Sequence, residues 1–193
     1  MSGRTIKDEM MKKITILIMM LMIAMAVDAQ KYMTKSGYIG FYSHTPIEDI
    51  KADNNQAAGV LDISTGDLVF QALIRSFKFS KALMEEHFNE NYMESDKYPK
   101  ASFKGKITNP GSVNFSKNGN YEVTVEGDLT IRDVTKKISV KGNLEVVTGG
   151  INGTSKFNVV PEDYNIKIPG VVKDKIAKTL EVTVSMKYLP VGK

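Results

Sequence analysis

A strict alternation of apolar and polar residues recurs through most of the chain. From Tyr121 to Ile131 the odd positions are apolar or glycine and the even positions are polar, and the same period of two recurs over Ile138–Val146 and Leu180–Tyr188. Successive side chains of a strand point to opposite faces of a sheet, so each segment predicts a strand with one buried and one solvated face. Such a chain is expected to be all-β.

Shorter segments of the same kind predict earlier strands. These are Tyr38–Ser43, Gly59–Ile63, Leu68–Ile74, Ala101–Ile107 and Val113–Phe115. Glycine and asparagine accept the positive φ that tight turns require, and they predict connections between strands. The expected turns are Ser64–Asp67, Asn118–Gly119, Gly149–Gly150 and Asn152–Gly153. Neighbouring strands are therefore expected to pair antiparallel.

One stretch departs from this period. Ser80–Glu94 carries apolar residues and His87 at helical spacing, which predicts a single amphipathic helix with Ser80 as its N-cap. Val171–Lys178 fits either a short helix or a loop.

Eight or nine strands with one helix fit either a closed barrel or a two-sheet sandwich. The pattern alone does not separate these two architectures. A barrel of this size is either filled by its own side chains or holds one small ligand.

The first 29 residues predict a signal peptide. Lys12 and Lys13 precede an apolar run of 14 residues, Ile14–Val27, and Val27–Ala29 resembles a cleavage site. A membrane anchor needs about 20 apolar residues, so cleavage is the expected outcome. The acidic residues before Met11 suit a signal peptide poorly, and a start at Met10 or Met11 would remove them. The expected domains are a signal peptide, 1–29, and one domain, 30–193.

Composition restricts the functional classes. The chain has no cysteine, which rules out a disulfide framework and a lipidated cysteine. Its net charge of +4 is small, and lysines alternate with acidic residues along the predicted strands rather than forming a basic stripe. We therefore expect no nucleic acid as a partner.

Motifs for catalysis or metal binding are poorly developed. His87 and Glu90 are one helical turn apart, but no third ligand is evident, so neither a metal nor another cofactor is expected. Ser43 and His44 are adjacent and would point to opposite faces of a strand. No nucleophile motif or phosphate-binding glycine loop occurs. These features predict a protein that is not an enzyme and has no catalytic residues.

Large apolar side chains remain as candidates for ligand binding. Those chosen are Phe70, Ile74, Phe77, Phe79, Met84, Phe88, Tyr92, Met93, Phe103, Ile107, Leu129, Ile131, Leu144 and Met186. They could equally form an ordinary filled core, because the pattern does not show whether they meet in the middle of the barrel.

Two motifs resemble the YceI-like family. Tyr98–Phe103 follows a helix that ends His87–Met93, as in that family's helix and Tyr-Pro-x-x-x-Phe strand. Gly127–Lys136 is similar to its Gly-x-Leu-Thr-Ile-x-Gly-Val-Thr-Lys hairpin, with Asp133 in place of a glycine. The resemblance extends over about Lys35–Tyr188, and no role is transferred to His44.

The resemblance implies an all-β fold, an antiparallel, lipocalin-like β-barrel of about eight strands with one amphipathic helix and an apolar tunnel. It also implies export to the bacterial periplasm and a long-chain isoprenoid or similar lipid as the ligand. It also allows transient membrane contact, and it implies no oligomeric state. The alternatives are a carrier of a quinone or fatty acid, a protein-binding scaffold with a solid core, and an enzyme acting on a lipid headgroup.

Overall fold

The computed structural model describes Met11 and residues 31–191. The predicted signal peptide lies outside these residues except for Met11, so it remains a prediction. The chain divides into two units at residue 30, and the second unit is the one described below. No helix among the described residues has the length and apolarity needed to cross a membrane.

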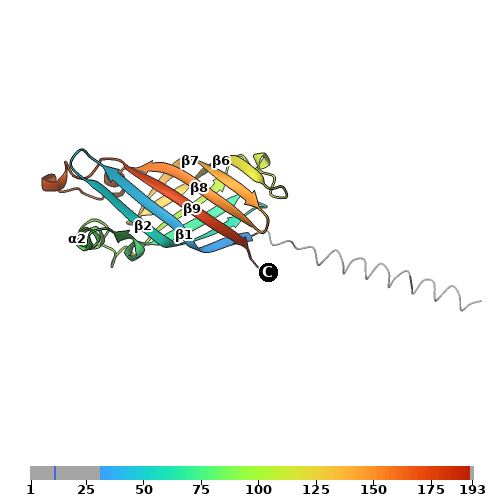
Figure 1. Ribbon diagram of the computed structural model, residues 1–193, viewed down its shortest axis with the longest axis horizontal. Helices are drawn as coiled ribbons and strands as arrows, with labels where there is room; N and C mark the ends of the chain where they lie inside the picture. Colours follow the sequence, from blue (N-terminus) through green and yellow to red (C-terminus); the bar gives the residue numbers. More distant parts are fainter. Residues whose placement is uncertain (1–10, 12–30, 192–193) are drawn as a thin grey trace, which may run out of the picture. The chain divides into compact units, whose positions relative to one another are not determined.

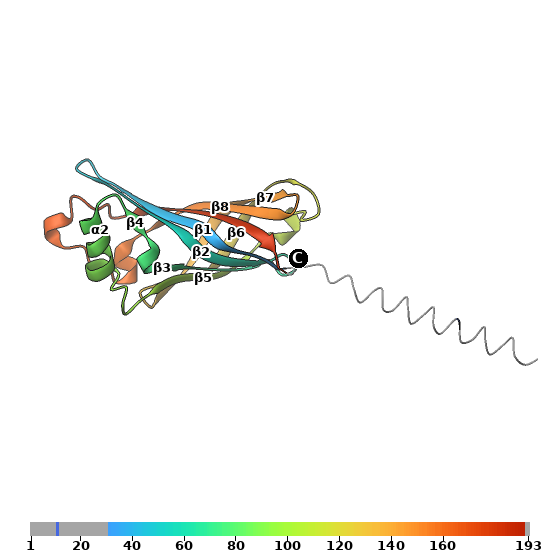
Figure 2. The same ribbon diagram turned by 60° about the horizontal axis from the view of Figure 1, so that its bottom comes forward.

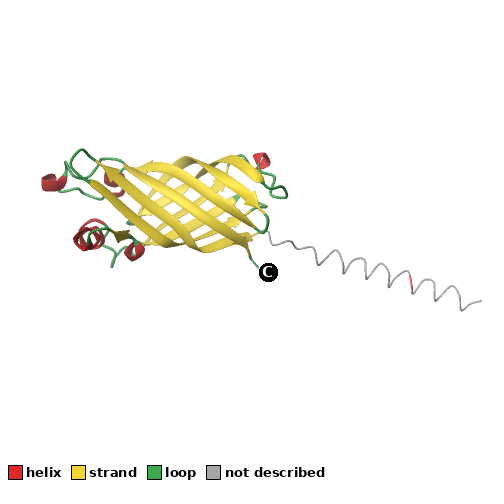
Figure 3. Ribbon diagram, viewed as in Figure 1, coloured by secondary structure: helices red, strands yellow, loops and turns green. Residues whose placement is uncertain are grey.

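The second unit is a closed antiparallel β-barrel (Figures 1 and 3). Its strands are β1 (Lys31–His44), β2 (Asp49–Asp62), β3 (Asp67–Leu73), β4 (Lys78–Phe79), β5 (Lys100–Ile107), β6 (Gly119–Ile131), β7 (Val134–Val147), β8 (Gly150–Val159) and β9 (Leu180–Pro190). The order is β1-β9-β8-β7-β6-β5-β3-β2, and β1 also pairs with β2 to close the ring. Two-residue β4 is an extra strand against β2. The predicted eight-stranded barrel is confirmed, and the two-sheet sandwich is excluded.

The barrel wall is incompletely paired at one end. β2 pairs with β3 only over Ala58–Leu61, and β7 pairs with β8 only over Gly142–Val147. Two segments connect strands at this end: a first covering segment, residues 74–99, between β3 and β5, and a second covering segment, residues 160–179, between β8 and β9. Both lie at the end where β1 turns into β2 and where α2 is found (Figure 2).

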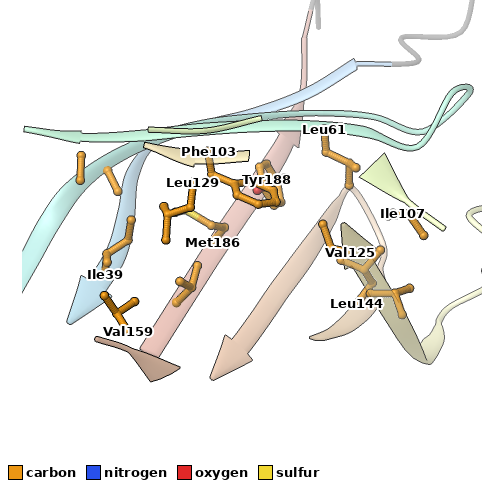
Figure 4. Close-up of a cluster of buried hydrophobic side chains, with 14 of the residues drawn as sticks. Ile39, Leu61, Phe103, Ile107, Val125, Leu129, Leu144, Val159, Met186 and Tyr188 are labelled. Carbon is orange, nitrogen blue, oxygen red and sulfur yellow. The ribbon is translucent and has the colours of Figure 1, made fainter. Parts of the chain in front are cut away.

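The other half of the barrel is filled. Leu61, Phe103, Ile107 and Ile151 are among its fully buried large side chains, and Figure 4 shows part of this cluster around Tyr188. Apolar burial of this kind is the largest favourable contribution to the free energy of folding.

The predicted turn at Asn152–Gly153 is wrong, and the position of Gly153 explains why. Asn152–Gly153 was expected to form a turn, but both residues lie within β8, and the turn is at Thr148–Gly149. A Cβ on Gly153 would lie 3.3 Å from the Tyr188 ring. The glycine therefore makes room for a large inward-facing ring and does not mark a turn.

Two further predictions were wrong near the start of β6. Val113–Phe115 is not a strand, because it follows the turn η3 (Pro110–Ser112) in the β5–β6 connection, where Val113 is buried. Asn118–Gly119 is not a hairpin turn, since Gly119 already pairs with Val146 as the first residue of β6.

The helical stretch is shorter than predicted. It consists of α2 (Ala82–His87) followed by the π-helix η2 (Phe88–Tyr92). The N-cap is Lys81 rather than Ser80, because the backbone carbonyl of Lys81 accepts the N–H groups of Met84 and Glu85. Of the two options for Val171–Lys178, the loop fits residues 173–178, whereas Val171 and Val172 belong to the short 3-10 helix η5 (Gly170–Val172).

Neighbouring residues of β2 provide a test of the inward and outward faces. Leu61 is 1% exposed and Val60 is 38% exposed. We expect Leu61→Ala to lower the free energy of unfolding by about 2–5 kcal/mol, because it leaves a cavity in the filled half. Val60→Ala is the matched control and should lower the free energy of unfolding by well under half as much. Urea unfolding measures both, and equal losses would contradict the assignment of faces.

Candidate functional site

A cavity of about 460 Å³ occupies the end of the barrel that carries α2. Its wall comes from the ends of β1, β2, β3, β5, β6, β8 and β9 at that end, from the β1–β2 turn and from both covering segments. The lining is almost entirely apolar, and the volume lies within the range of about 300–1,000 Å³ usual for small-molecule sites. The hollow is therefore confined to one half of the barrel and is not a tunnel through its whole length.

The size of the inward side chains explains where the hollow begins. Phe70 and Phe103 are directly paired on β3 and β5, and their rings stack with centroids 5.1 Å apart. Two residues further along, Ala72 pairs with Ala101. Both alanines line the cavity, whereas the Phe103 ring lies behind Phe70, outside it. Replacing a pair of large side chains by a pair of small ones leaves space that the wall does not fill.

Four phenylalanine rings form one side of the cavity. Phe88 of η2 packs against Phe41 of β1 and against Phe77 and Phe79, with ring centroids 5.6, 5.7 and 5.0 Å apart. Phe41 also contacts Phe77 and Phe79, each at 5.8 Å. The cluster holds the first covering segment against β1 while leaving ring surface exposed to the cavity.

The few charged groups on the lining lie on the covering segments and at the β1–β2 turn. Glu48 Oε1 is 2.9 Å from the Lys81 ammonium, and this contact holds the pKa of Glu48 below its ordinary value. On the same side, the buried Ser43 hydroxyl accepts a hydrogen bond of 2.9 Å from the backbone N–H of Ala177. These contacts join the β1–β2 turn to both covering segments.

No acid, base or nucleophile set is assembled around the cavity among the described residues. His87 lines it without a hydrogen-bonded carboxylate. His44 lies outside it, exposed, with Nδ1 2.6 Å from Asp49. Burial raises the pKa of Tyr92, so its phenol stays protonated near neutral pH. Nor do three or more His, Asp or Glu side chains gather in this part of the chain to hold a metal ion.

The structure brings together most of the proposed ligand-binding residues. The cavity wall includes Phe70, Ile74, Phe77, Phe79, Met84, Phe88, Tyr92, Met93, Leu129 and Ile131. The other four do not line it, because they belong to the filled part of the barrel. These are Phe103, Ile107, Leu144 and Met186. Contact between a ligand and any of the fourteen proposed residues remains a prediction.

Other lining residues escaped the sequence analysis. On β1 and β9 they are Ile39, Phe41, Val182 and Val184, all on the inward face of an alternating segment. Alternation identifies that face but not which half of it is hollow. The second covering segment adds Pro161, Ile166, Ile168, Val172 and Ile176. Its only sequence signal is a sparse series of apolar residues in a lysine-rich loop.

Comparison with known proteins places this architecture in a family. The model of the YceI-like domain matches residues 31–188. The chain belongs to the YceI-like family. A comparison with curated proteins finds no similar sequence.

Solved structures of low sequence identity share the YceI-like fold. A polyisoprenoid-binding domain from Saccharophagus degradans, implicated in plant cell wall breakdown, has a TM-score of 0.73 at 13% identity, covering 83% of this chain and 98% of that one. BcnA of Burkholderia cenocepacia scores 0.65 at 12% identity, with 78% and 95% covered. The YceI protein of Campylobacter jejuni scores 0.57 at 16% identity, with 75% and 86% covered.

The aromatic cluster of this YceI-like protein can be tested by a double-mutant cycle. We expect Phe79→Ala and Phe88→Ala to couple by about 0.5–1.5 kcal/mol in the free energy of unfolding, because their rings interact directly. Phe88→Ala with Phe103→Ala is the control pair, and its coupling should be near zero. Urea unfolding of the single and double variants measures both cycles. Additivity of the Phe79 and Phe88 changes would contradict a shared cluster.

Proposed function

We propose that this protein is an exported, non-catalytic carrier of a long-chain isoprenoid-type lipid. The observation that carries the proposal is the apolar cavity at one end of the barrel, bounded by the aromatic cluster and by Ala72 and Ala101. A solid-core scaffold would have no such hollow. The polyisoprenoid-binding domain of similar fold supports the choice of ligand class.

The lining suits a ligand recognised by shape and apolarity. Each CH₂ group that leaves water contributes about 0.8 kcal/mol, so a prenyl chain gains affinity without directional contacts. Ordering of the chain offsets part of this gain. A chain too long for 460 Å³ would keep its headgroup, and the carbons next to it, at the end where the covering segments meet.

The proposal that the protein is non-catalytic rests on the same cavity lining. His87, Tyr92 and the ion-paired Glu48 and Lys81 are separate polar groups on an apolar wall, and none is arranged to activate another. A lipid held there would be sheltered from water and left unchanged.

Solvent extraction of the purified protein followed by mass spectrometry tests the ligand. We expect a prenyl lipid to be recovered in amounts comparable to the protein. A quinone or a fatty acid in the extract would show that the ligand belongs to that class and is not an isoprenoid. An empty extract, together with failure to bind added geranylgeraniol, would overturn the carrier proposal.

A cavity-filling variant tests the site itself. Ala101→Phe places a ring in the hollow next to Ala72. If this ring displaces two CH₂ groups of the ligand, binding should weaken at least about tenfold. Val60→Phe, on the outward face of β2, adds the same ring where it cannot reach the cavity. Calorimetric titration with geranylgeraniol compares the two variants, and unchanged affinity of Ala101→Phe would place the ligand elsewhere.

Export is tested at the N-terminus of the protein recovered from cells. We expect the periplasmic form to begin at Gln30, because cleavage after Ala29 follows the signal-peptide pattern. Intact mass spectrometry reads the new N-terminus. Full-length protein confined to the cytoplasm would contradict export without affecting the lipid proposal.

A further inference from the structure

The three most exposed large apolar side chains of residues 31–191 lie at the same end of the barrel as the cavity. They are Val171, 92% exposed, Ile47, 62% exposed, and Leu83, 60% exposed. Each belongs to a different loop or helix, and these elements extend past the strands at one end (Figures 1 and 2). Leu83 lines the cavity itself, and Val171 and Ile47 are next in sequence to the lining residues Val172 and Glu48.

The segment that carries Val171 is also strongly basic. Residues 167–178, the cationic segment, contain four lysines, Lys167, Lys173, Lys175 and Lys178, against the single acid Asp174. Among the described residues none of these lysines forms an ion pair. The charge of Lys175 helps to lower the pKa of Glu48, and the charge of the other three lysines is available to a partner.

Some acidic groups of the neighbouring elements have partners of their own. Glu48 pairs with Lys81 at 2.9 Å, Asp49 with His44 at 2.6 Å, and Glu85 with Lys78 at 2.5 Å. Within residues 31–191, Glu86 and Glu90 of α2 and η2 form no ion pair, and neither do Glu162 and Asp163 of the turn η4 (Pro161–Tyr164), which precedes the cationic segment. The positive charge at this end is thus concentrated on the cationic segment and not spread evenly around the cavity.

We propose that the cationic segment, with Val171 at its tip, docks the protein on the surface of an anionic phospholipid bilayer. The inference rests on the proposed carrier function, since it gives the lipid a path between bilayer and cavity. An aliphatic side chain inserts among the acyl chains while flanking lysines contact lipid phosphates, the usual combination at a membrane surface. Val172, Lys175 and Ile176 of the same segment line the cavity, so docking brings its wall to the bilayer.

Vesicle flotation with the full exported chain tests this docking. We expect binding to vesicles of phosphatidylcholine containing phosphatidylglycerol, little binding to phosphatidylcholine alone, and loss of binding in 1 M salt, where charge is screened beyond about 3 Å. Lys173→Gln with Lys175→Gln should weaken partitioning by about fivefold for each lysine. Val171→Asp should weaken it at least about tenfold.

Control variants change the same chemistry elsewhere. Lys104→Gln with Lys106→Gln removes two exposed charges from β5, and Val191→Asp alters an exposed apolar side chain just after β9. Both should bind vesicles as the unaltered protein does. Equal binding to neutral and anionic vesicles, or undiminished binding of the variants in the cationic segment, would overturn the proposal. So would a dimer in sedimentation that Val171→Asp dissociates, because the occupant would then be a second copy.

Failure of docking is separable from failure of the carrier function. Titration with geranylgeraniol in detergent, without vesicles, should give the same affinity for Val171→Asp and for the unaltered protein. A protein that binds this prenol but no anionic vesicle refutes docking alone. A protein that binds the vesicles but no prenol refutes the carrier function alone.

Discussion

Closure of the barrel forces every inward-facing side chain to compete for one interior space. Once β1 pairs with both β2 and β9, the width of the interior is set by the eight strands, and only side-chain size can vary along it. Phe103, Tyr188 and Leu61 fill one half to the exclusion of solvent. Ala72 and Ala101 leave the other half hollow. The site is thus a consequence of where large inward residues stop.

The barrel wall at the hollow end also has fewer backbone hydrogen bonds between strands. β2 before Ala58 and β7 before Gly142 lack the β3 and β8 partners that a complete wall would supply. The first covering segment pairs with β2 only through the two residues of β4. Side-chain contacts join both covering segments to the end of β1 and the β1–β2 turn, such as Lys81 with Glu48 and Ala177 with Ser43. Segments held in this way can open at lower cost than paired strands. A cavity closed by them can admit a ligand without disrupting the barrel.

The sequence predicted the fold better than the site. Long alternating segments such as Tyr121–Ile131 identified strands and their buried faces, because alternation follows directly from strand geometry. β8 escaped notice since its inward positions include Gly153 and Ser155, which carry no apolar signal. The extent of the hollow also escaped, because Ile107 and Phe70 look alike in sequence although one lies in the filled half and the other lines the cavity. That difference depends on the side chains across the barrel.

A ligand bound by apolar contact leaves little trace in sequence for a related reason. Catalysis requires particular groups at fixed distances, and their spacing can be recognised, whereas an apolar wall can be built from any large or small aliphatic residues of suitable total volume. The informative positions are then the departures from a filled core. Here these are small residues facing inward, as at Ala72, and apolar residues facing outward, as at Val171. These two positions lie at the same end of the barrel, where folding energy alone does not account for them.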